Sequence, residues 1–103
     1  MKAKFEQGHI VKLPGYSNEF LVVSSDDFIE ETGLIHVCPI FEDLPFSNRH
    51  IPIDEDAPKA KVAICERLEL IDPAKKQPKI TGRLSYPVVL TVSDVLKEIF
   101  QYS

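Results

Sequence analysis

The sequence predicts a small, mainly β domain, an antiparallel barrel or half-open sheet, that ends in a single helix. Short runs rich in β-branched residues recur between residues 8 and 71, and Pro, Gly or acidic turns separate them. After Ser85 the apolar residues instead repeat with the helical period of about 3.6 residues. Strands and helices do not alternate along the chain, so a parallel sheet is not expected. A length of 103 residues is typical of one domain, and residues 1–103 are expected to form one.

Three strands are expected in the first part of the chain, at residues 8–13, 19–25 and 33–41. Only seven residues, expected to form an acidic loop, join the second run to the third, which favours an antiparallel pair. Pro39 lies within the third run. Because proline cannot donate a hydrogen bond to a neighbouring strand, Pro39 predicts an edge strand or a bulge.

Two further strands are expected in the second part of the chain. Residues 50–53 form a short run interrupted by proline, and residues 59–65 alternate in part between polar and apolar. Residues 66–71 can extend the second of these strands. Residues 73–78 are polar, basic and bounded by prolines, which is typical of a loop.

One long helix is expected after Ser85, ending near Gln101. Ser85 suits the N-cap, and the apolar side chains that follow fall on one stripe of a helix. We expect three of them, Val92, Leu96 and Ile99, to be buried against the sheet.

The composition excludes several classes of protein. No apolar run approaches the roughly 20 residues of a membrane-spanning helix, and the N-terminus lacks the apolar stretch of a signal peptide, so a cytoplasmic location is expected. Cys38 and Cys65 lie in apolar runs, where small core residues are favoured over a disulfide. Gly-rich phosphate loops, Cys-x-x-Cys motifs and zinc-spaced His pairs are missing, so neither metal nor cofactor is expected.

A local basic surface and a few titratable side chains remain as candidates for function. The net charge is −4, yet residues 59–83 are rich in Lys and Arg and could contact nucleic acid. His9 and His36 lie in expected strands, where a hydrogen-bonded structural histidine is the common outcome. Arg49 and His50 lie in a loop beside a strand, where they could face a phosphate or remain a solvent-exposed pair.

Five segments follow one another in the order of the MazF/PemK toxins, and the chain resembles that family from residue 8 to about 101. The segments are Gly-His-Ile-Val at 8–11, Phe-Leu-Val-Val-Ser at 20–24, Gly-Leu-Ile-His-Val-Cys-Pro-Ile at 33–40, Leu-Glu-Leu-Ile-Asp at 68–72 and Ile-Thr-Gly-Arg-Leu-Ser at 80–85. Residues 20–40 are also similar to the related gyrase poison CcdB, which shares the fold. Each motif is short, so their order and spacing carry the resemblance.

The resemblance implies an SH3-like antiparallel barrel that forms a homodimer. It also implies the growth-inhibiting toxin of a type II toxin–antitoxin system, with a cognate antitoxin as partner. MazF-like members cut single-stranded RNA without a metal or cofactor, by attack of the ribose 2′-hydroxyl, and leave a cyclic phosphate. The protein supplies a base, an acid and a cation that stabilises the phosphorane-like transition state.

Two positions depart from the family's catalytic pattern. Asn18 stands where the resemblance places a catalytic Arg, and Phe41 stands where it places a catalytic Thr. If the chemistry was rebuilt elsewhere, the candidate catalytic residues are Arg49, His50 and Glu66. The candidate RNA-binding residues are Lys59, Lys61, Arg67, Lys75, Lys76 and Arg83. The alternatives are a CcdB-like toxin that acts by binding gyrase or another partner, although the C-terminal Trp-Gly-Ile of that poison is absent, and a catalytically silent interaction module.

Overall fold

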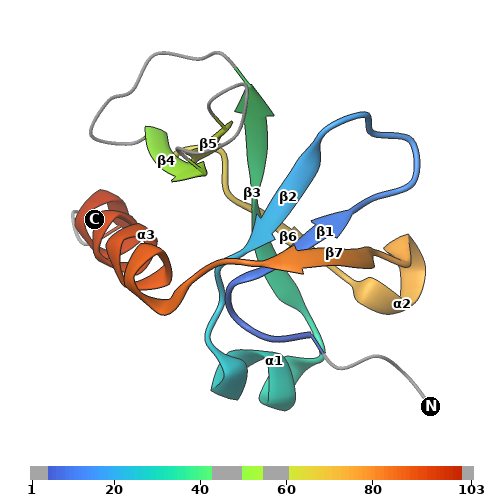
Figure 1. The fold of residues 1–103 in the computed structure, drawn as a ribbon. Coiled ribbons are helices and arrows are strands. Elements are labelled where there is room, and N and C mark those ends of the chain that lie inside the picture. Colours follow the sequence, from blue (N-terminus) through green and yellow to red (C-terminus); the bar gives the residue numbers. More distant parts are fainter. Residues whose placement is uncertain (1–4, 43–49, 55–60, 101–103) are drawn as a thin grey trace.

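The computed structural model describes residues 5–42, 50–54 and 61–100, which contain seven strands and three helices (Figure 1). In chain order these are β1 (His9–Lys12), β2 (Glu19–Val22), α1 (Asp26–Thr32), β3 (Ile35–Glu42), β4 (His50–Asp54), β5 (Lys61–Ile64), β6 (Glu69–Ile71), α2 (Pro73–Lys76), β7 (Lys79–Arg83) and α3 (Tyr86–Phe100).

The strands form one strongly bent antiparallel sheet, which confirms the predicted fold class. Their order is β4-β5-β3-β2-β1-β7, and β6 pairs with β3 beside β5. Every strand pair is antiparallel. The first strand therefore lies beside the last one, with His9 opposite Arg83, and α3 leaves the sheet directly after that last strand (Figure 1).

The strand that carries Pro39 is central and its registers show no bulge there, so the expectation of an edge strand or a bulge was wrong. One edge of β3 pairs with β2, where Pro39 lies opposite Phe20. The other edge pairs with β6 at Ile35–Val37 and with β5 at Ile40–Glu42. Pro39 falls between these two partners, and its missing N–H removes no hydrogen bond of either register.

Three local elements differ from the sequence expectations. The acidic segment expected as a loop is α1: Ser25 Oγ accepts the N–H of Phe28, and Gly33, with φ of 70°, ends the helix. The expected loop at residues 73–78 contains the single turn α2, whose N-cap is Asp72. The segment 79–83, for which the sequence analysis expects no strand, is β7. In α1 only Ile29 is buried, so the helix has almost no apolar stripe that periodicity could detect.

Within the described residues the core consists of two clusters of buried side chains, one on each face of β2. Phe20 and Val22 belong to the cluster that also holds Ile29 of α1. Leu21 and Val23 belong to the other cluster, which holds Val92 of α3. Successive side chains of a strand point to opposite faces, so a strand covered on both faces reads as one continuous apolar run.

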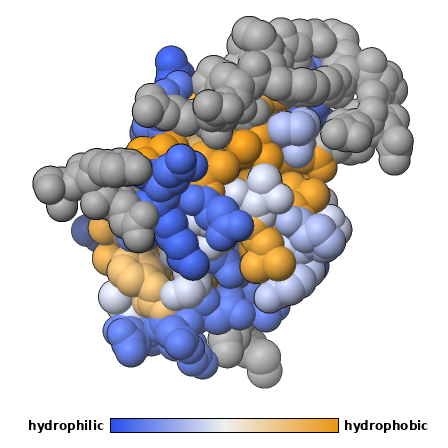
Figure 2. All heavy atoms as spheres, turned by 90° about the vertical axis from the view of Figure 1, so that its left-hand side faces the viewer, coloured by the Kyte–Doolittle hydropathy of each residue, from blue (hydrophilic) through white to orange (hydrophobic). Residues whose placement is uncertain are grey.

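Helix α3 covers the second cluster incompletely. Val92 is buried as predicted, whereas Leu96 and Ile99 contact the cluster and remain half-buried. Leu90 is 45% exposed, and hydrophobic residues reach the surface on the face that carries this helix (Figure 2). Cys38 and Cys65 lie in the same cluster as buried free thiols, as the sequence predicts.

Candidate functional site

A groove of about 560 Å³ lies where the ends of four neighbouring strands meet, β1, β2, β3 and β5. Lys12 ends β1 and lies opposite Glu19, which begins β2. Glu42 ends β3 and lies opposite Lys61, which begins β5. The connection between β1 and β2 adds Ser17 and Asn18 to the lining of the groove, and β3 adds Ile40 and Phe41. Two ammonium groups and two carboxylates therefore line one concave surface.

Glu19 is held on both of its carboxylate oxygens. The Nζ of Lys61 lies 3.3 Å from Oε1, and the hydroxyl of Thr81 donates to Oε2 over 2.6 Å. The Lys61 and Glu19 side chains are 34% and 25% exposed, so both still reach solvent in the groove. The Nδ2 of Asn18 donates to the backbone carbonyl of Glu19 over 3.0 Å. These contacts fix both the side chain and the backbone of the acid.

Thr81 reaches Glu19 because β7 contains a bulge. Opposite β1, Ile10 pairs with Gly82 and Val11 pairs with Ile80, which leaves Thr81 as an extra residue without a partner in the register. A bulge locally twists a strand and redirects a side chain. Here the redirected hydroxyl reaches past β1 to the carboxylate on β2, and it lies 3.3 Å from the carbonyl oxygen of Ile10.

The surroundings of Glu19 keep it ionised at neutral pH. The hydrogen bond from Thr81 is the largest influence and lowers the pKa of Glu19 below its ordinary value. Partial burial acts in the opposite direction, and Lys61 and Lys12 lower the pKa further. The groove thus holds a carboxylate that is fixed in its ionised form beside two cations.

Among the catalytic residues expected from the sequence, Glu66 and the backbone of His50 lie away from the groove. Arg49 lies outside the described residues, and the backbone of His50 lies on β4 opposite Ile64. Glu66 is exposed in the turn after β5. Because a strand rises about 3.3 Å per residue, the Ile64 end of β5 lies roughly 10 Å from the Lys61 end. His50 and Glu66 are therefore close in the strand pairing, but at the opposite end of β5 from the groove.

The basic residues expected to bind RNA are spread over the fold. Lys59 lies outside the described residues, and Lys61 lies in the groove. Arg67 is exposed in the turn between β5 and β6, and Lys75 and Lys76 are exposed on α2. Arg83 lies at the other end of β7, where it is engaged by acidic and imidazole groups.

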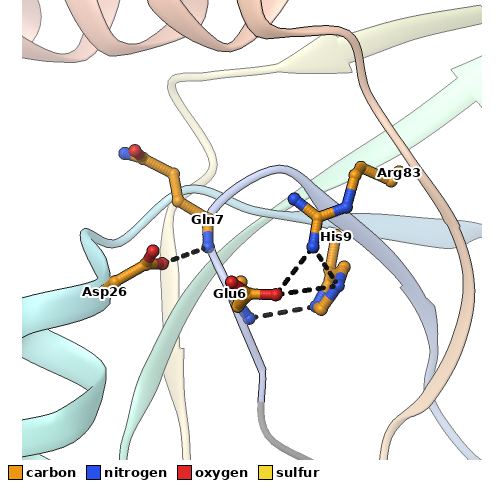
Figure 3. A network of polar contacts seen from close by, with 5 residues as sticks. All are labelled: Glu6, Gln7, His9, Asp26 and Arg83. Carbon is orange, nitrogen blue, oxygen red and sulfur yellow. Dashed lines mark hydrogen bonds and ion pairs between the residues drawn. The ribbon is translucent and has the colours of Figure 1, made fainter.

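Arg83 belongs to a second polar network, at the start of β1 (Figure 3). Its guanidinium lies 2.7 Å from Oε1 of Glu6 and 2.9 Å from Nε2 of His9. Nδ1 of His9 accepts the backbone N–H of Glu6 over 3.0 Å. Next to it, the backbone N–H of Gln7 donates to Asp26 and ties this segment to α1. Burial, and then the charge of Arg83, lower the pKa of His9, so a neutral imidazole is favoured.

The sequence singled out Lys61 but missed Lys12, Glu19 and Thr81. The one sequence signal for the groove is the pair of opposite charges that flank the Pro-Gly turn, Lys12 and Glu19. Nothing in the local sequence predicts the bulge at Thr81. His36, expected to be structural, is half-buried with its ring against Phe28.

The described part of the chain contains no group of three or more His, Cys, Asp or Glu side chains that could hold a metal ion. Within the same residues, none of the helices has the length and apolar character needed to cross a membrane.

Comparison with solved structures identifies the fold. The MazE–MazF complex from Deinococcus radiodurans (Form-II) matches with a TM-score of 0.81 at 17% identity, over 99% of this chain and 100% of that chain. An endoribonuclease from a mycobacterial species also gives 0.81, at 9% identity, over 98% and 95% of the two chains. The Mycobacterium tuberculosis toxin MazF-mt6 gives 0.70 at 16% identity, over 95% and 99%. No protein-family model and no curated protein matches the sequence. Nearly complete coverage in both directions shows that this chain has the fold of the MazF toxins.

Proposed function

We propose that this chain is the growth-inhibiting toxin of a toxin–antitoxin pair and that it cleaves single-stranded RNA in the groove. One observation carries the proposal: Asn18 and Phe41, the positions where the MazF resemblance places a catalytic Arg and Thr, line the same groove as Lys12, Glu19 and Lys61. The two positions at which the resemblance places catalytic residues therefore border a concave, charged surface, although both of the expected side chains are replaced.

The chemistry of RNA cleavage fits such a surface. Attack of the ribose 2′-hydroxyl on the adjacent phosphodiester needs a proton acceptor, a proton donor and a cation near the phosphate, and no metal. The groove offers the ionised carboxylate of Glu19 and two ammonium groups, and Glu42 also lines it. An RNA strand carries one negative charge per nucleotide, so exposed Lys and Arg side chains elsewhere on the fold can contact neighbouring phosphates.

Backbone binding is proposed for the basic residues of the 59–83 stretch. They are Lys59, Lys61, Arg67, Lys75, Lys76 and Arg83. For a single strand, each phosphate contact that is lost should make the slope of log affinity against log salt concentration less steep by about 0.7. Arg83 is expected to contribute least, because Glu6 already neutralises its charge.

Two sets of catalytic residues are open to test under this function. The set expected from the sequence is Arg49, His50 and Glu66, and the set that lines the groove contains Glu19 and Lys61. Cleavage that survives Arg49→Ala, His50→Ala and Glu66→Gln together would reject the first set. The position of the groove supports the second.

Three further properties belong to the same proposal. A cognate antitoxin neutralises the chain, as the solved complex of a mycobacterial endoribonuclease with its antitoxin illustrates for that protein. Two copies associate, which is supported by the half-buried apolar stripe of α3 that a second copy could cover. The toxin acts in the cytoplasm, where RNA is accessible. Sedimentation at micromolar concentration should give a species of twice the 11.7 kDa chain.

The function is tested by controlled expression and by cleavage in vitro. Expression should arrest growth, and the purified protein with a chelator should cut a mixed-sequence RNA and leave 2′,3′-cyclic phosphate ends. Arrest without cleavage would favour the CcdB-like binding toxin over the ribonuclease. If neither arrest nor cleavage occurs, the proposed function is wrong and a silent interaction module is favoured.

A further inference from the structure

Building on the proposed RNA cleavage, we propose that Glu19 is the general base of the reaction, that Lys61 binds the reacting phosphate, and that Thr81 positions Glu19. Lys12 completes the set as the proton donor to the leaving group. This assignment replaces the missing Arg and Thr of the family pattern with side chains from four other strand positions.

The arrangement of the three central residues supports these roles. Thr81 and Lys61 come from β7 and β5, and they contact different oxygens of the same carboxylate on β2. A carboxylate has about four acceptor positions, so two remain for a substrate hydroxyl. The cation beside it lies in the groove and is only partly buried, which leaves its ammonium protons accessible to a phosphate oxygen.

A purely structural ion pair explains these observations less well. An ion pair at this degree of exposure adds at most about 1 kcal/mol to stability. A bulge interrupts the hydrogen bonds between two strands, and bulges are frequent beside active sites because they redirect a side chain. In this chain the bulge is at Thr81, and the hydroxyl that it redirects is the group that holds Glu19.

The residues that replace the family's catalytic pair fit this assignment. Asn18 carries no charge, but it donates to the backbone carbonyl of Glu19 and so fixes the start of β2. Phe41 cannot donate a hydrogen bond, and it lies half-buried in the groove wall. The cation thus comes from β5 instead of the β1–β2 connection, and the hydroxyl comes from β7 instead of β3.

The reaction balances with these groups alone. The carboxylate of Glu19 takes the proton of the 2′-hydroxyl while the 2′-oxygen forms a bond to phosphorus. Lys61 faces the non-bridging phosphate oxygens, whose negative charge grows as the bond forms. The bond from phosphorus to the 5′-oxygen breaks, and that oxygen takes a proton from the ammonium of Lys12. Glu19 then releases its proton to water and Lys12 regains one, so that no proton is gained or lost overall.

The first experiment compares Glu19→Gln with a matched control. Glu69→Gln changes another strand glutamate, exposed on β6 and remote in register from the groove. We expect Glu19→Gln to lower the rate of RNA cleavage by about 100- to 10,000-fold, and Glu69→Gln to leave it unchanged. Far-UV circular dichroism and the urea midpoint establish that both variants fold. A folded Glu19→Gln variant that cleaves at the wild-type rate overturns the assignment and leaves the proposed function intact.

The second experiment tests Thr81 as a positioning residue. Thr81→Val removes the hydrogen bond that most lowers the pKa of Glu19, whereas Thr81→Ser keeps a hydroxyl. Since the base must be ionised, the acid limb of the pH–rate profile should move to higher pH in Thr81→Val, and Thr81→Ser should restore it. A rate loss without this movement overturns the positioning role. Absence of cleavage by the wild type overturns the proposed function and this assignment together.

Discussion

The two ends of β1 carry polar networks of similar composition in different settings. At the Lys12 end, Glu19 contacts Thr81 of β7 and Lys61 of β5 beside a groove. At the His9 end, Glu6 contacts Arg83 of β7 beside a buried imidazole. Each network contains a glutamate and a cation and includes one residue of the last strand, Thr81 in the first and the cation Arg83 itself in the second. Their composition alone does not distinguish a reactive site from a structural contact.

The distinction comes from what the partners leave free. Glu6 donates its own backbone N–H to the ring of His9, and Arg83 contacts both side chains, so this network joins a local turn to the last strand. The groove network also joins distant strands, but it leaves a carboxylate and an ammonium facing a concavity. A polar cluster that satisfies itself stabilises the fold, whereas one that faces a cavity can bind a substrate.

The largest difference between the two networks is expected in catalysis. Lys61→Ala should lower the rate of RNA cleavage by about 100- to 1,000-fold, the usual effect of losing a cationic or hydrogen-bonding group that stabilises a transition state. Arg83→Ala should change it by less than about threefold, because it removes a surface ion pair. Single-turnover rates at saturating protein measure both effects. If Arg83→Ala lowers the rate of RNA cleavage more than Lys61→Ala does, the comparison is reversed.

Substitutions in the network at the His9 end should lower the stability of the fold more than substitutions in the groove network. His9 is only 8% exposed and accepts the N–H of Glu6, so His9→Ala leaves a partly buried donor without a partner. We expect a loss of about 1–3 kcal/mol in the free energy of unfolding. Glu19→Gln should cost less than about 1 kcal/mol, because its ion pair is partly solvated. Urea denaturation at pH 7 compares the two variants, and equal urea midpoints would contradict the expected difference in stability.

The smallest effect is expected in the dependence of stability on pH. The pKa of His9 is lowered in the folded state, so the unfolded chain binds more protons below the ordinary value of 6.5, and stability falls as the pH drops through that range. The pKa of Glu19 is lowered from 4.5, so its contribution is present above pH 4.5 and is lost as the pH falls through the folded value. His9→Gln should flatten only the upper window and Glu19→Gln only the lower one. Urea midpoints measured from pH 3.5 to 8 show whether each substitution affects its own window.

The sequence predicted the fold class and the helix because both depend on local periodicity. The strand runs and the stripe that contains Val92 follow from the spacing of apolar residues alone. The position of Pro39 was wrong because strand order is a long-range property: a proline between two partner strands looks in sequence like a proline at an edge. Helix α1 was missed because its first turn is acidic and it buries only Ile29.

The candidate site was harder to predict than the fold. Glu19 is 42 residues from Lys61 and 62 residues from Thr81 in sequence. A one-residue bulge decides whether the hydroxyl of Thr81 reaches Glu19. The spacing of apolar residues in the sequence does not indicate such a bulge. The loop position of residues 49–50 and the family resemblance at residue 66 instead favour residues that lie at the far end of β5 or outside the described residues.

The pairing of β1 with β7 also determines when the site is complete during protein synthesis. The two contacts of Thr81, to Ile10 and to Glu19, span 71 and 62 residues. Contacts of such high sequence separation form late, because most of the chain must exist before the loop between them can close. A nascent chain that has not yet emerged beyond residue 81 contains Lys12, Glu19 and Lys61 but has no hydroxyl to hold the carboxylate. The ribosome that makes this protein therefore releases almost the whole domain before the groove takes its final form.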